Sequence, residues 1–369
     1  MKGTPLFKRR GLLAATAATL AAGLLARPSD RGGAYSPYFA GLNEALKALP
    51  ATRPRMMLDL DRVDNNIDVI REHIPNNKTW RIVVKSLPSM DLLDYIMQRG
   101  ETSSLMLFHQ PFLSQVAERF PDTDVLLGKP LPVTAAAKFY AQLGDTGFDP
   151  QRQLQWLIDS IERLQEYHQL ARETGTNLRV NLEIDIGLHR GGFATNESLE
   201  QALSYIQDHS QHLTLAGFMG YEPFIAKLPA RNYQFKRATG RYRELVDFAR
   251  SRYPALFNEA MTYNTAGSQT YQLYRDDDFF NDICVGSGVV LPSDFDLPTV
   301  TDHQPAAFIA TPVLKQYDQV MISGLEESSS LFALANPNRQ QAFYIYGGNW
   351  LADYENPPGL IRNNIWGYS

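Results

Sequence analysis

From residue 55 onward, short apolar segments of the chain alternate with longer segments whose apolar residues recur every three or four positions. The first pattern is typical of buried β-strands and the second of amphipathic helices. Eight strand-like segments occur within about 210 residues, which matches a (β/α)8 barrel in number and size. The predicted strands are Met56–Asp61, Arg81–Ser86, Ser104–Phe108, Asp124–Gly128, Leu154–Asp159, Arg179–Gly187, Leu213–Tyr221 and Met261–Thr265.

Helices are predicted between these strands, and the polar residues Asp61, Asp91 and Ser160 are candidate N-caps. The main alternative is a doubly wound open sheet, whose first strand is usually followed by a glycine-rich turn. No such turn follows Met56–Asp61, so an α/β fold of the TIM-barrel type is favoured. The predicted helices are Asp61–His73, Gln110–Phe120, Val133–Leu143, Ile161–Thr174, Glu197–His209 and Arg231–Tyr253.

The pattern changes after Pro292, where prolines become frequent and the helical periodicity ends. Short β segments are predicted there, separated by Pro, Gly and Asn residues. They are Ala307–Val313, Val320–Ser323, Leu331–Ala335 and Ala342–Tyr346. The expected organisation is a signal peptide at 1–26, an N-terminal arm at 27–54, the barrel at 55–298 and a small β domain at 299–369.

The N-terminus has the composition of an export signal. Residues 1–29 contain no acidic residue, and the basic head ends in Arg9-Arg10 before the uncharged segment Gly11–Ala26. This pattern predicts a secretory leader, of the twin-arginine type or the ordinary Sec type, and a periplasmic protein. An uncleaved membrane anchor is the second choice, because 16 helical residues extend only about 24 Å, less than the hydrocarbon core of about 30 Å.

Charge and cysteine content exclude several classes of protein. The chain has 35 Lys+Arg and 40 Asp+Glu residues, a formal charge of −5, and no strong basic stripe, so no nucleic-acid partner is expected. Its hydrophobic content of 44% argues against a disordered chain. The one cysteine, Cys284, rules out a disulfide within the chain and a cysteine-rich metal site.

Barrels of this type carry their functional residues at the C-terminal ends of the strands. One predicted strand ends at Lys85, in the sequence Arg-Ile-Val-Val-Lys-Ser. Burial at such a position lowers the pKa of a lysine and makes its neutral amine available for attack on a carbonyl. The alternative is a surface lysine whose charged end reaches the solvent.

A second strand presents polar residues, Glu183 and Asp185 among them, at alternate positions and therefore on one face. Since the intervening residues are apolar, the polar face is expected to point into the barrel. Two carboxylates there require cations or hydrogen bonds, and Lys85 and Arg190 are the nearest candidate cations. The alternative is a structural polar network in the barrel floor.

Small and hydroxyl residues follow the last predicted strand, from Asn264 to Thr270, and recur at Gly286-Ser287-Gly288. Such turns admit an anion close to the backbone, and barrel enzymes often bind phosphate after their last two strands. Tyr221 ends another strand at the same end of the barrel, although a buried tyrosine more often only packs. A lysine, a phosphate-binding turn, an aromatic ring and an arginine are the groups that a pyridoxal phosphate site requires.

At these residues the sequence resembles the fold-type III pyridoxal phosphate enzymes. It resembles more closely the alanine racemase N-terminal-domain proteins, which include D-threonine aldolase and eukaryotic-type D-serine dehydratase. The resemblance extends from about residue 53 to about residue 300 and rests on the order and spacing of several motifs. These are Pro54–Asp61, Val83–Ser86, Glu183–Gly187 with Arg190 and Gly192, Leu215–Tyr221, Asn264–Thr270 and Gly286-Ser287.

The resemblance implies a role for each of these residues. Lys85 would hold pyridoxal 5'-phosphate as an internal aldimine and move the α-proton, Arg190 would hydrogen-bond the phenolate oxygen of the ring, and Tyr221 would lie near the ring. The implied activity is that of a racemase or lyase acting at Cα of an amino acid, and a homodimer is one assembly that it allows. The other cofactor contacts would come from Asn264, Thr265, Gly267, Ser268, Gly286 and Ser287.

The sequence also departs from the family pattern. The aldolase and dehydratase branch has a His followed two positions later by Cys or Asp as metal ligands, whereas the last histidine here, His303, is followed by Pro305, so no metal site is predicted. The short segment after the barrel suggests an incomplete C-terminal β domain. Two other functions stay open: a pyridoxal-phosphate-binding protein without turnover, and a cofactor-free barrel hydrolase with Glu183 and Asp185 as acid and base.

Overall fold

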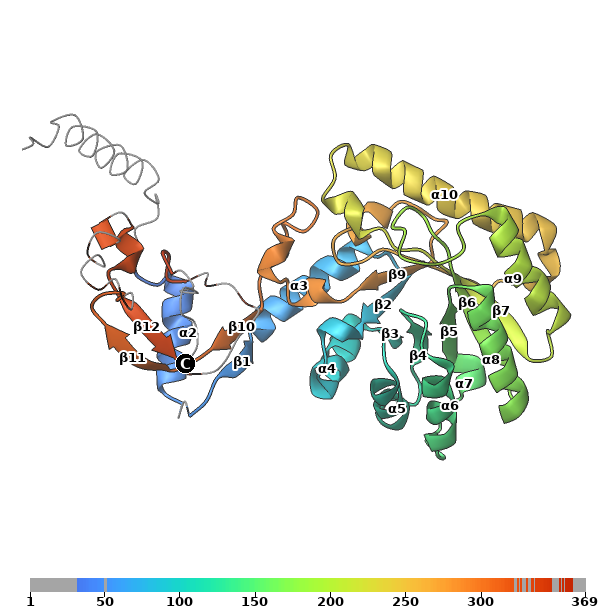
Figure 1. Cartoon of the computed structure of the whole chain (residues 1–369), viewed down its shortest axis with the longest axis horizontal. Coiled ribbons are helices and arrows are strands. Elements are labelled where there is room, and N and C mark those ends of the chain that lie inside the picture. The colour runs from blue at the N-terminus through green and yellow to red at the C-terminus, as the bar shows by residue number, and fades with distance from the viewer. Residues whose placement is uncertain are drawn as a thin grey trace, which may run out of the picture. The chain divides into compact units, whose positions relative to one another are not determined.

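The structure is a computed structural model of the chain (Figure 1) and describes residues 32–49, 52–321, 324, 326, 330, 333–334, 336–346, 352, 354 and 356–360. Its contacts divide the chain into two compact units. One is Leu58–Ala307, and the other combines Met1–Met57 with Phe308–Ser369. The leader predicted at 1–26 lies outside the described residues. Among the residues that are described, no helix is long and apolar enough to cross a membrane.

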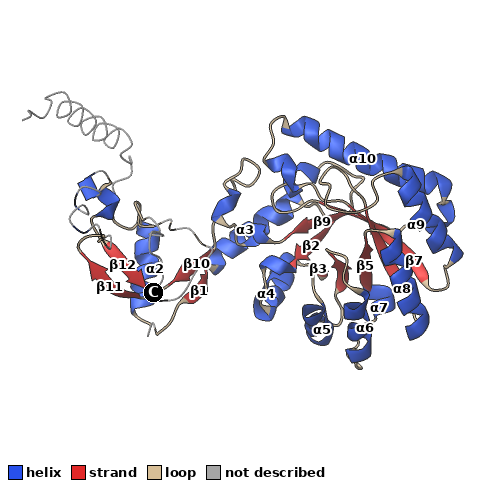
Figure 2. Ribbon diagram, viewed as in Figure 1, coloured by secondary structure: helices blue, strands red, loops and turns tan. Residues whose placement is uncertain are grey.

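The larger unit is a closed barrel of eight strands, in the order β2 to β9. Every neighbouring pair runs parallel, and Figure 2 shows the helices on the outside of the strands. The predicted TIM-type barrel is thereby confirmed. Its strands are β2 (Thr79–Val83), β3 (Ser104–Leu107), β4 (Asp124–Leu127), β5 (Leu154–Ile158), β6 (Leu178–Glu183), β7 (Leu213–Met219), β8 (Thr262–Thr265) and β9 (Asp282–Val285).

The structure corrects which segments form this barrel. The predicted first strand, Met56–Asp61, is not part of it, because β1 (Arg55–Leu58) pairs with β10 (Ala307–Ala310) in a separate two-stranded sheet. The eighth barrel strand is instead β9, which was not predicted. The lysine strand is therefore the first of the barrel, and the strand that ends at Thr265 is the seventh.

An ion cluster inside the barrel explains why an acid is tolerated in β9. Arg81 of β2 is almost fully buried, and its Nη2 donates to Asp282 at 2.7 Å and to Asp124 of β4 at 2.6 Å. Asn264 of β8 also donates to Asp282 through its side-chain amide. Arg81 neutralises the buried Asp282 carboxylate and Asn264 hydrogen-bonds it, as a buried charge requires. The cluster thus links the closing pair β2–β9 to β4 and β8.

The six predicted helices agree with the structure to within one residue at each end, whereas the helices Met90–Gly100 and Pro150–Gln153 had no predicted bounds. Ser160 caps its helix as predicted, but two other caps differ: Asp59 and Ser89 accept the capping hydrogen bonds, while Asp61 and Asp91 lie in the first helical turn. The described helices of this unit are α3 (Leu60–His73), α4 (Met90–Gly100), α5 (Gln110–Arg119), α6 (Val133–Gln142), α7 (Pro150–Gln153), α8 (Ile161–Thr174), α9 (Asn196–Asp208) and α10 (Arg231–Arg252).

The second unit combines segments that are far apart in the sequence. Helix α2 (Pro37–Lys47) places the ring of Phe39 5.3 Å from that of Phe308, which lies in β10. The backbone N–H of Ser36 donates to Asn356 Oδ1 at 3.0 Å. Described residues of the predicted arm and of the predicted C-terminal domain therefore share one compact unit.

The remaining strands of this unit form an antiparallel pair, β11 (Val313–Tyr317) and β12 (Ala342–Ile345). Strand β12 corresponds to the predicted segment Ala342–Tyr346 and β10 to the predicted segment Ala307–Val313, whereas β11 was not predicted. The other two predicted segments, Val320–Ser323 and Leu331–Ala335, fall partly outside the described residues and contain no strand within them.

Candidate functional site

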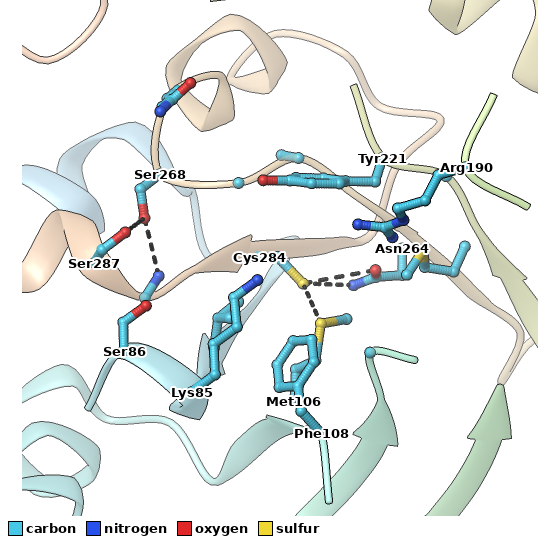
Figure 3. A pocket seen from close by; sticks show the side chains of 18 of the residues that line it. Lys85, Ser86, Met106, Phe108, Arg190, Tyr221, Asn264, Ser268, Cys284 and Ser287 are labelled. Carbon is cyan, nitrogen blue, oxygen red and sulfur yellow. Dashed lines mark hydrogen bonds between the residues drawn. The ribbon is translucent and has the colours of Figure 1, made fainter. Parts of the chain in front are cut away.

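A cavity opens at the C-terminal ends of the barrel strands, with about 560 Å³ of empty volume including its mouth. Figure 3 shows side chains from segments near the ends of several strands converging on it. Of the predicted site residues, Thr265 lies behind the cavity wall and the others line it. Those that line it are Lys85, Arg190, Tyr221, Asn264, Gly267, Ser268, Gly286 and Ser287.

Lys85 lies in the short 3-10 turn η1 (Val84–Ser86), directly after β2. Its Nζ is 4.7 Å from the centroid of the Phe108 ring. Burial lowers the pKa of Lys85, and the positive charges of Arg190 and Lys129 lower it further. These effects favour the neutral amine, which is the form that attacks a carbonyl carbon.

Arg190 and Tyr221 lie together on the other side of the cavity (Figure 3). The Arg190 Nη2 donates to Glu183 Oε1 at 3.3 Å, and its guanidinium carbon is 5.2 Å from the Tyr221 ring centroid. Burial raises the pKa of Tyr221 to about 12, and the neighbouring Glu222 also raises it, so the phenol is neutral at physiological pH. The site thus presents a fixed cation beside a neutral phenol.

The two carboxylates predicted to point into the barrel are compensated in different ways. Glu183 forms the ion pair with Arg190 described above, whereas Asp185 accepts hydrogen bonds from the backbone N–H groups of Gly187 and His189 at 2.9 and 3.0 Å. The His189 imidazole lies 2.8 Å from the other Asp185 oxygen. These hydrogen bonds hold the loop that carries Arg190. Neither carboxylate is among the described residues that line the cavity.

Two turns meet at the opposite side of the cavity from Arg190 (Figure 3). The Ser268 Oγ accepts hydrogen bonds from the backbone N–H groups of Gly286 and Gly288, at 3.1 and 2.9 Å. Two amide donors therefore converge on a single oxygen, beside the hydroxyl of Ser287 at 3.4 Å. This arrangement of backbone N–H and hydroxyl groups is suited to binding an anion.

Gly286 is required here for steric reasons. A Cβ atom at this position would lie 2.4 Å from the backbone oxygen of Val83, the last residue of β2. The turn after β9 therefore packs directly against the backbone that leads into Lys85. Only glycine permits this approach, and it brings the turn after β9 close to the lysine.

Sequence reasoning missed a fully buried acid, Glu222, behind the cavity wall. It accepts hydrogen bonds from the hydroxyls of Thr270 at 2.7 Å and Thr265 at 3.2 Å, so Thr265 supports the loop after β8 from behind. Burial raises the pKa of Glu222 to about 7. The signal in the sequence was an acid next to Tyr221 at the end of an apolar strand.

An eight-stranded parallel barrel with a lysine after its first strand and glycine- and serine-containing turns after its last two is the architecture of the fold-type III class. Comparison with known families agrees with this class. Residues 58–290 match the family described as alanine racemase, N-terminal domain, and the chain belongs to that family. Members of the family depend on pyridoxal phosphate.

One curated relative is the alanine racemase of Ligilactobacillus salivarius (strain UCC118). The chain is 31% identical to it over 90 residues, which are 24% of this chain and 24% of that protein. The chain thus matches about a quarter of the length of this relative.

Several solved structures have the same fold. The alanine racemase from E. faecalis superimposes with a TM-score of 0.57 at 18% identity, covering 73% of this chain and 68% of that one. The D-threonine aldolase from Filomicrobium marinum gives 0.58 at 17% identity, over 72% and 73% of the two chains. The D-threo-3-hydroxyaspartate dehydratase from Delftia sp. HT23 gives 0.58 at 19% identity, over 72% and 68%.

Proposed function

We propose that this protein is a pyridoxal-phosphate-dependent enzyme that acts at Cα of an amino acid, as a racemase or a lyase. The observation that carries the proposal is the position of Lys85, an amine with a lowered pKa, in the same cavity as Ser268, on whose Oγ two backbone amides converge. A phosphorylated aldehyde needs a neutral amine to react with its carbonyl group and an anion site to bind its phosphate. Membership in the family described above supports the same function.

The donor set of the cavity fits the cofactor. The amides of Gly286 and Gly288, with the hydroxyls of Ser268 and Ser287, would bind the phosphate. Arg190 would interact with the ring at the other end of the cavity, where Glu183 fixes its guanidinium. When bound, pyridoxal phosphate supplies an electron sink for the charge that develops at Cα of an amino acid.

The residues of the chain would bind, orient and transfer protons around this group. The Lys85 Nζ would hold the cofactor and, when free, take or return the proton at Cα. The neutral Tyr221 phenol and the apolar side chains of Met106 and Phe108 would cover the reacting centre and limit access of water. The amino acid substrate would be chosen by the remaining space in the cavity.

The proposal is tested first by cofactor binding. Purified protein mixed with pyridoxal phosphate should develop a visible absorbance band, and borohydride should then fix the cofactor on Lys85, as found by peptide mass spectrometry. The Lys85→Ala variant should lack both signals, whereas Lys138→Met, an exposed change on α6, should keep them. If the unaltered protein shows no band and no modified Lys85, the cofactor assignment is wrong.

A second assay separates the reaction types. Single-enantiomer amino acids are incubated with the loaded protein, and the products are examined for the opposite enantiomer, a keto acid or an aldehyde. The first product identifies a racemase, and the other two identify an elimination or a retro-aldol lyase. Binding of the cofactor without any of these products would favour a non-catalytic binding protein.

The cofactor-free hydrolase has weaker support. Glu183 is paired with Arg190, and Asp185 is occupied by hydrogen bonds from its own loop. Since neither is among the described residues lining the cavity, a substrate there would not meet them.

We also propose that the basic, acid-free N-terminal segment directs export, on the basis of its sequence alone. The test is the location and size of the protein in cells. Replacement of Arg9 and Arg10 by lysines should leave the precursor in the cytoplasm if a twin-arginine route is used. Export of an unprocessed, membrane-bound chain would instead indicate an anchor.

A further inference from the structure

A buried histidine lies directly behind the anion-binding turn, on the side away from the cavity. This residue, His303, follows the barrel in the sequence and is almost fully buried. Its Nδ1 is 2.8 Å from the carbonyl oxygen of Gly288, in the turn η5 (Ser287–Val289). It does not line the cavity among the described residues, and the proposed function has not used it.

The contact fixes one peptide unit of the turn at both ends. The unit between Gly288 and Val289 has its N–H donated to the Gly286 carbonyl at 3.0 Å and its C=O facing His303. Glycine has no Cβ to restrict its backbone, so its dihedral angles depend on such external contacts. Holding this unit restricts the rotation on one side of Gly288, whose N–H donates to the Ser268 Oγ at 2.9 Å.

The hydrogen bonds determine which tautomer His303 adopts. A carbonyl oxygen cannot donate, so the Nδ1 that faces Gly288 must carry the proton. The Nε2 then accepts from the Tyr271 hydroxyl, at 2.7 Å. The Tyr271 oxygen in turn accepts from Gln272 Nε2 at 3.2 Å. Burial lowers the pKa of His303, which agrees with a neutral imidazole in this chain of hydrogen bonds.

The network extends to the surface and gives the imidazole a fixed orientation. The Gln272 amide also donates to Asp302 at 2.9 Å, and the same carboxylate lies 3.2 Å from His73 Nε2. The histidine is therefore held on its Nε2 side by a chain of partners while its Nδ1 side holds the turn.

We propose that His303 is a positioning residue for the phosphate of the cofactor, acting through the Gly288 carbonyl to aim the Gly288 amide. This inference rests on the proposed function, since it assumes that the turn binds the phosphate. It predicts that the contribution of His303 appears only with ligands that carry the phosphate.

The test compares the affinities for pyridoxal phosphate and for pyridoxal, which lacks the phosphate, by absorbance titration. Three variants separate the two sides of the imidazole. His303→Asn keeps an amide donor near the Nδ1 position, His303→Gln moves it to the Nε2 position, and Tyr271→Phe removes the Nε2 partner alone. Thermal unfolding of each variant checks that the barrel is folded.

We expect His303→Gln to lower the ratio of pyridoxal phosphate affinity to pyridoxal affinity by about tenfold, the effect of one buried hydrogen bond. His303→Asn and Tyr271→Phe should leave this ratio within about threefold of the unaltered protein, because a donor to Gly288 remains. An unchanged ratio in His303→Gln overturns the proposal. An equal fall in Tyr271→Phe, or a fall in both affinities together, overturns it also, because such results indicate a general structural role.

A measurement on the unaltered protein needs no variant. Nitrogen-15 NMR of the His303 side chain should show the Nδ1–H tautomer, and the Nε2–H tautomer would contradict the proposal. The proposed function fails separately, if the unaltered protein binds neither pyridoxal phosphate nor pyridoxal. Binding of both with equal affinity would retain the aldehyde site at Lys85 and reject the phosphate-binding turn.

Discussion

The amine of Lys85 lies among other cations, and its charge state depends on them. Lys129 follows β4 and lowers the pKa of Lys85, but it does not itself line the cavity among the described residues. It therefore offers a way to change the acidity of the amine without altering the groups that would contact the cofactor.

We expect Lys129→Met to raise the pKa of Lys85, because a neighbouring positive charge is removed. The reaction of Lys85 with a small aldehyde, followed by borohydride and mass spectrometry, should then need a higher pH. The matched control is Lys138→Met, the same change at an exposed position on α6, which should leave the pH profile unchanged. A profile that does not move in Lys129→Met would show that burial and Arg190 set the acidity without Lys129.

Glu222 makes the stability of the barrel depend on pH. Its pKa is raised from 4.5 to about 7 by burial, so the folded protein favours the protonated form. The stabilisation is present below pH 4.5 and is lost as the pH rises through about 7. At about 1.4 kcal/mol per pKa unit, the change amounts to a few kcal/mol.

The Glu222→Gln variant should lack this dependence. We measure the free energy of unfolding in urea for the variant and for the unaltered protein. The value for the variant minus the value for the unaltered protein should rise between pH 5 and pH 8, on the order of a few kcal/mol. Glu118→Gln, an exposed change on α5, is the control and should show no such trend. Parallel curves for Glu222→Gln and the unaltered protein would mean that the carboxyl titrates normally in the fold.

Individual site residues could be predicted where their position at the end of a strand was enough to place them. Lys85, Arg190 and Tyr221 follow apolar strands, and in a barrel all such ends face one mouth. Glu222 and His303 could not be assigned, because their surroundings come from contacts between separate loops. Thr265 could not be assigned correctly for the same reason. It lies in the predicted motif, but its hydroxyl faces Glu222 instead of the cavity.

Among the secondary-structure elements, the helices were the most predictable. The bounds of α8 agree with the prediction, because its periodicity, its Ser160 cap and its terminal Gly175 all indicate the same helix. Strand membership was less predictable, since a four-residue strand carries little pattern. Strand β9 was missed, and the arginine that compensates its buried Asp282, Arg81, is about 200 residues away in the sequence.

That partnership leads to a prediction about barrel closure. Asp282→Ala should lower the free energy of unfolding by about 3–5 kcal/mol, because it leaves Arg81 buried with less compensation. Asp124→Ala removes the other partner of the same arginine, but this carboxylate is 35% exposed against 5% for Asp282, so its cost should be about 1 kcal/mol. Urea denaturation measures both, and equal costs would show that burial does not decide the difference.

At the scale of the whole molecule, the two compact units differ in how much they bury. Every residue of β5 in the barrel is buried, whereas every residue of β11 is exposed and α2 contains no buried residue. Regions with few buried contacts open at lower free energy than the core does.

Native-state hydrogen exchange should therefore divide the chain along the same boundary. We expect the amides of α2 and β11 to exchange through openings of lower free energy than those of β5. Equal protection of the two units would contradict this prediction and would indicate that another surface, such as a second copy of the chain, covers the exposed strands.

The division of the chain into two units has a consequence for the order in which they can fold during synthesis. Helix α2 is synthesised before the barrel, but Phe308, against which its Phe39 packs, is synthesised after the barrel. At roughly 5–20 residues per second, the ribosome needs on the order of ten seconds or more to make the intervening segment. During that time the barrel sequence emerges while Phe39 has no Phe308 to pack against. Because its partner is synthesised late, the second unit is completed last. Until then the segment that contains Phe39 is accessible to chaperones.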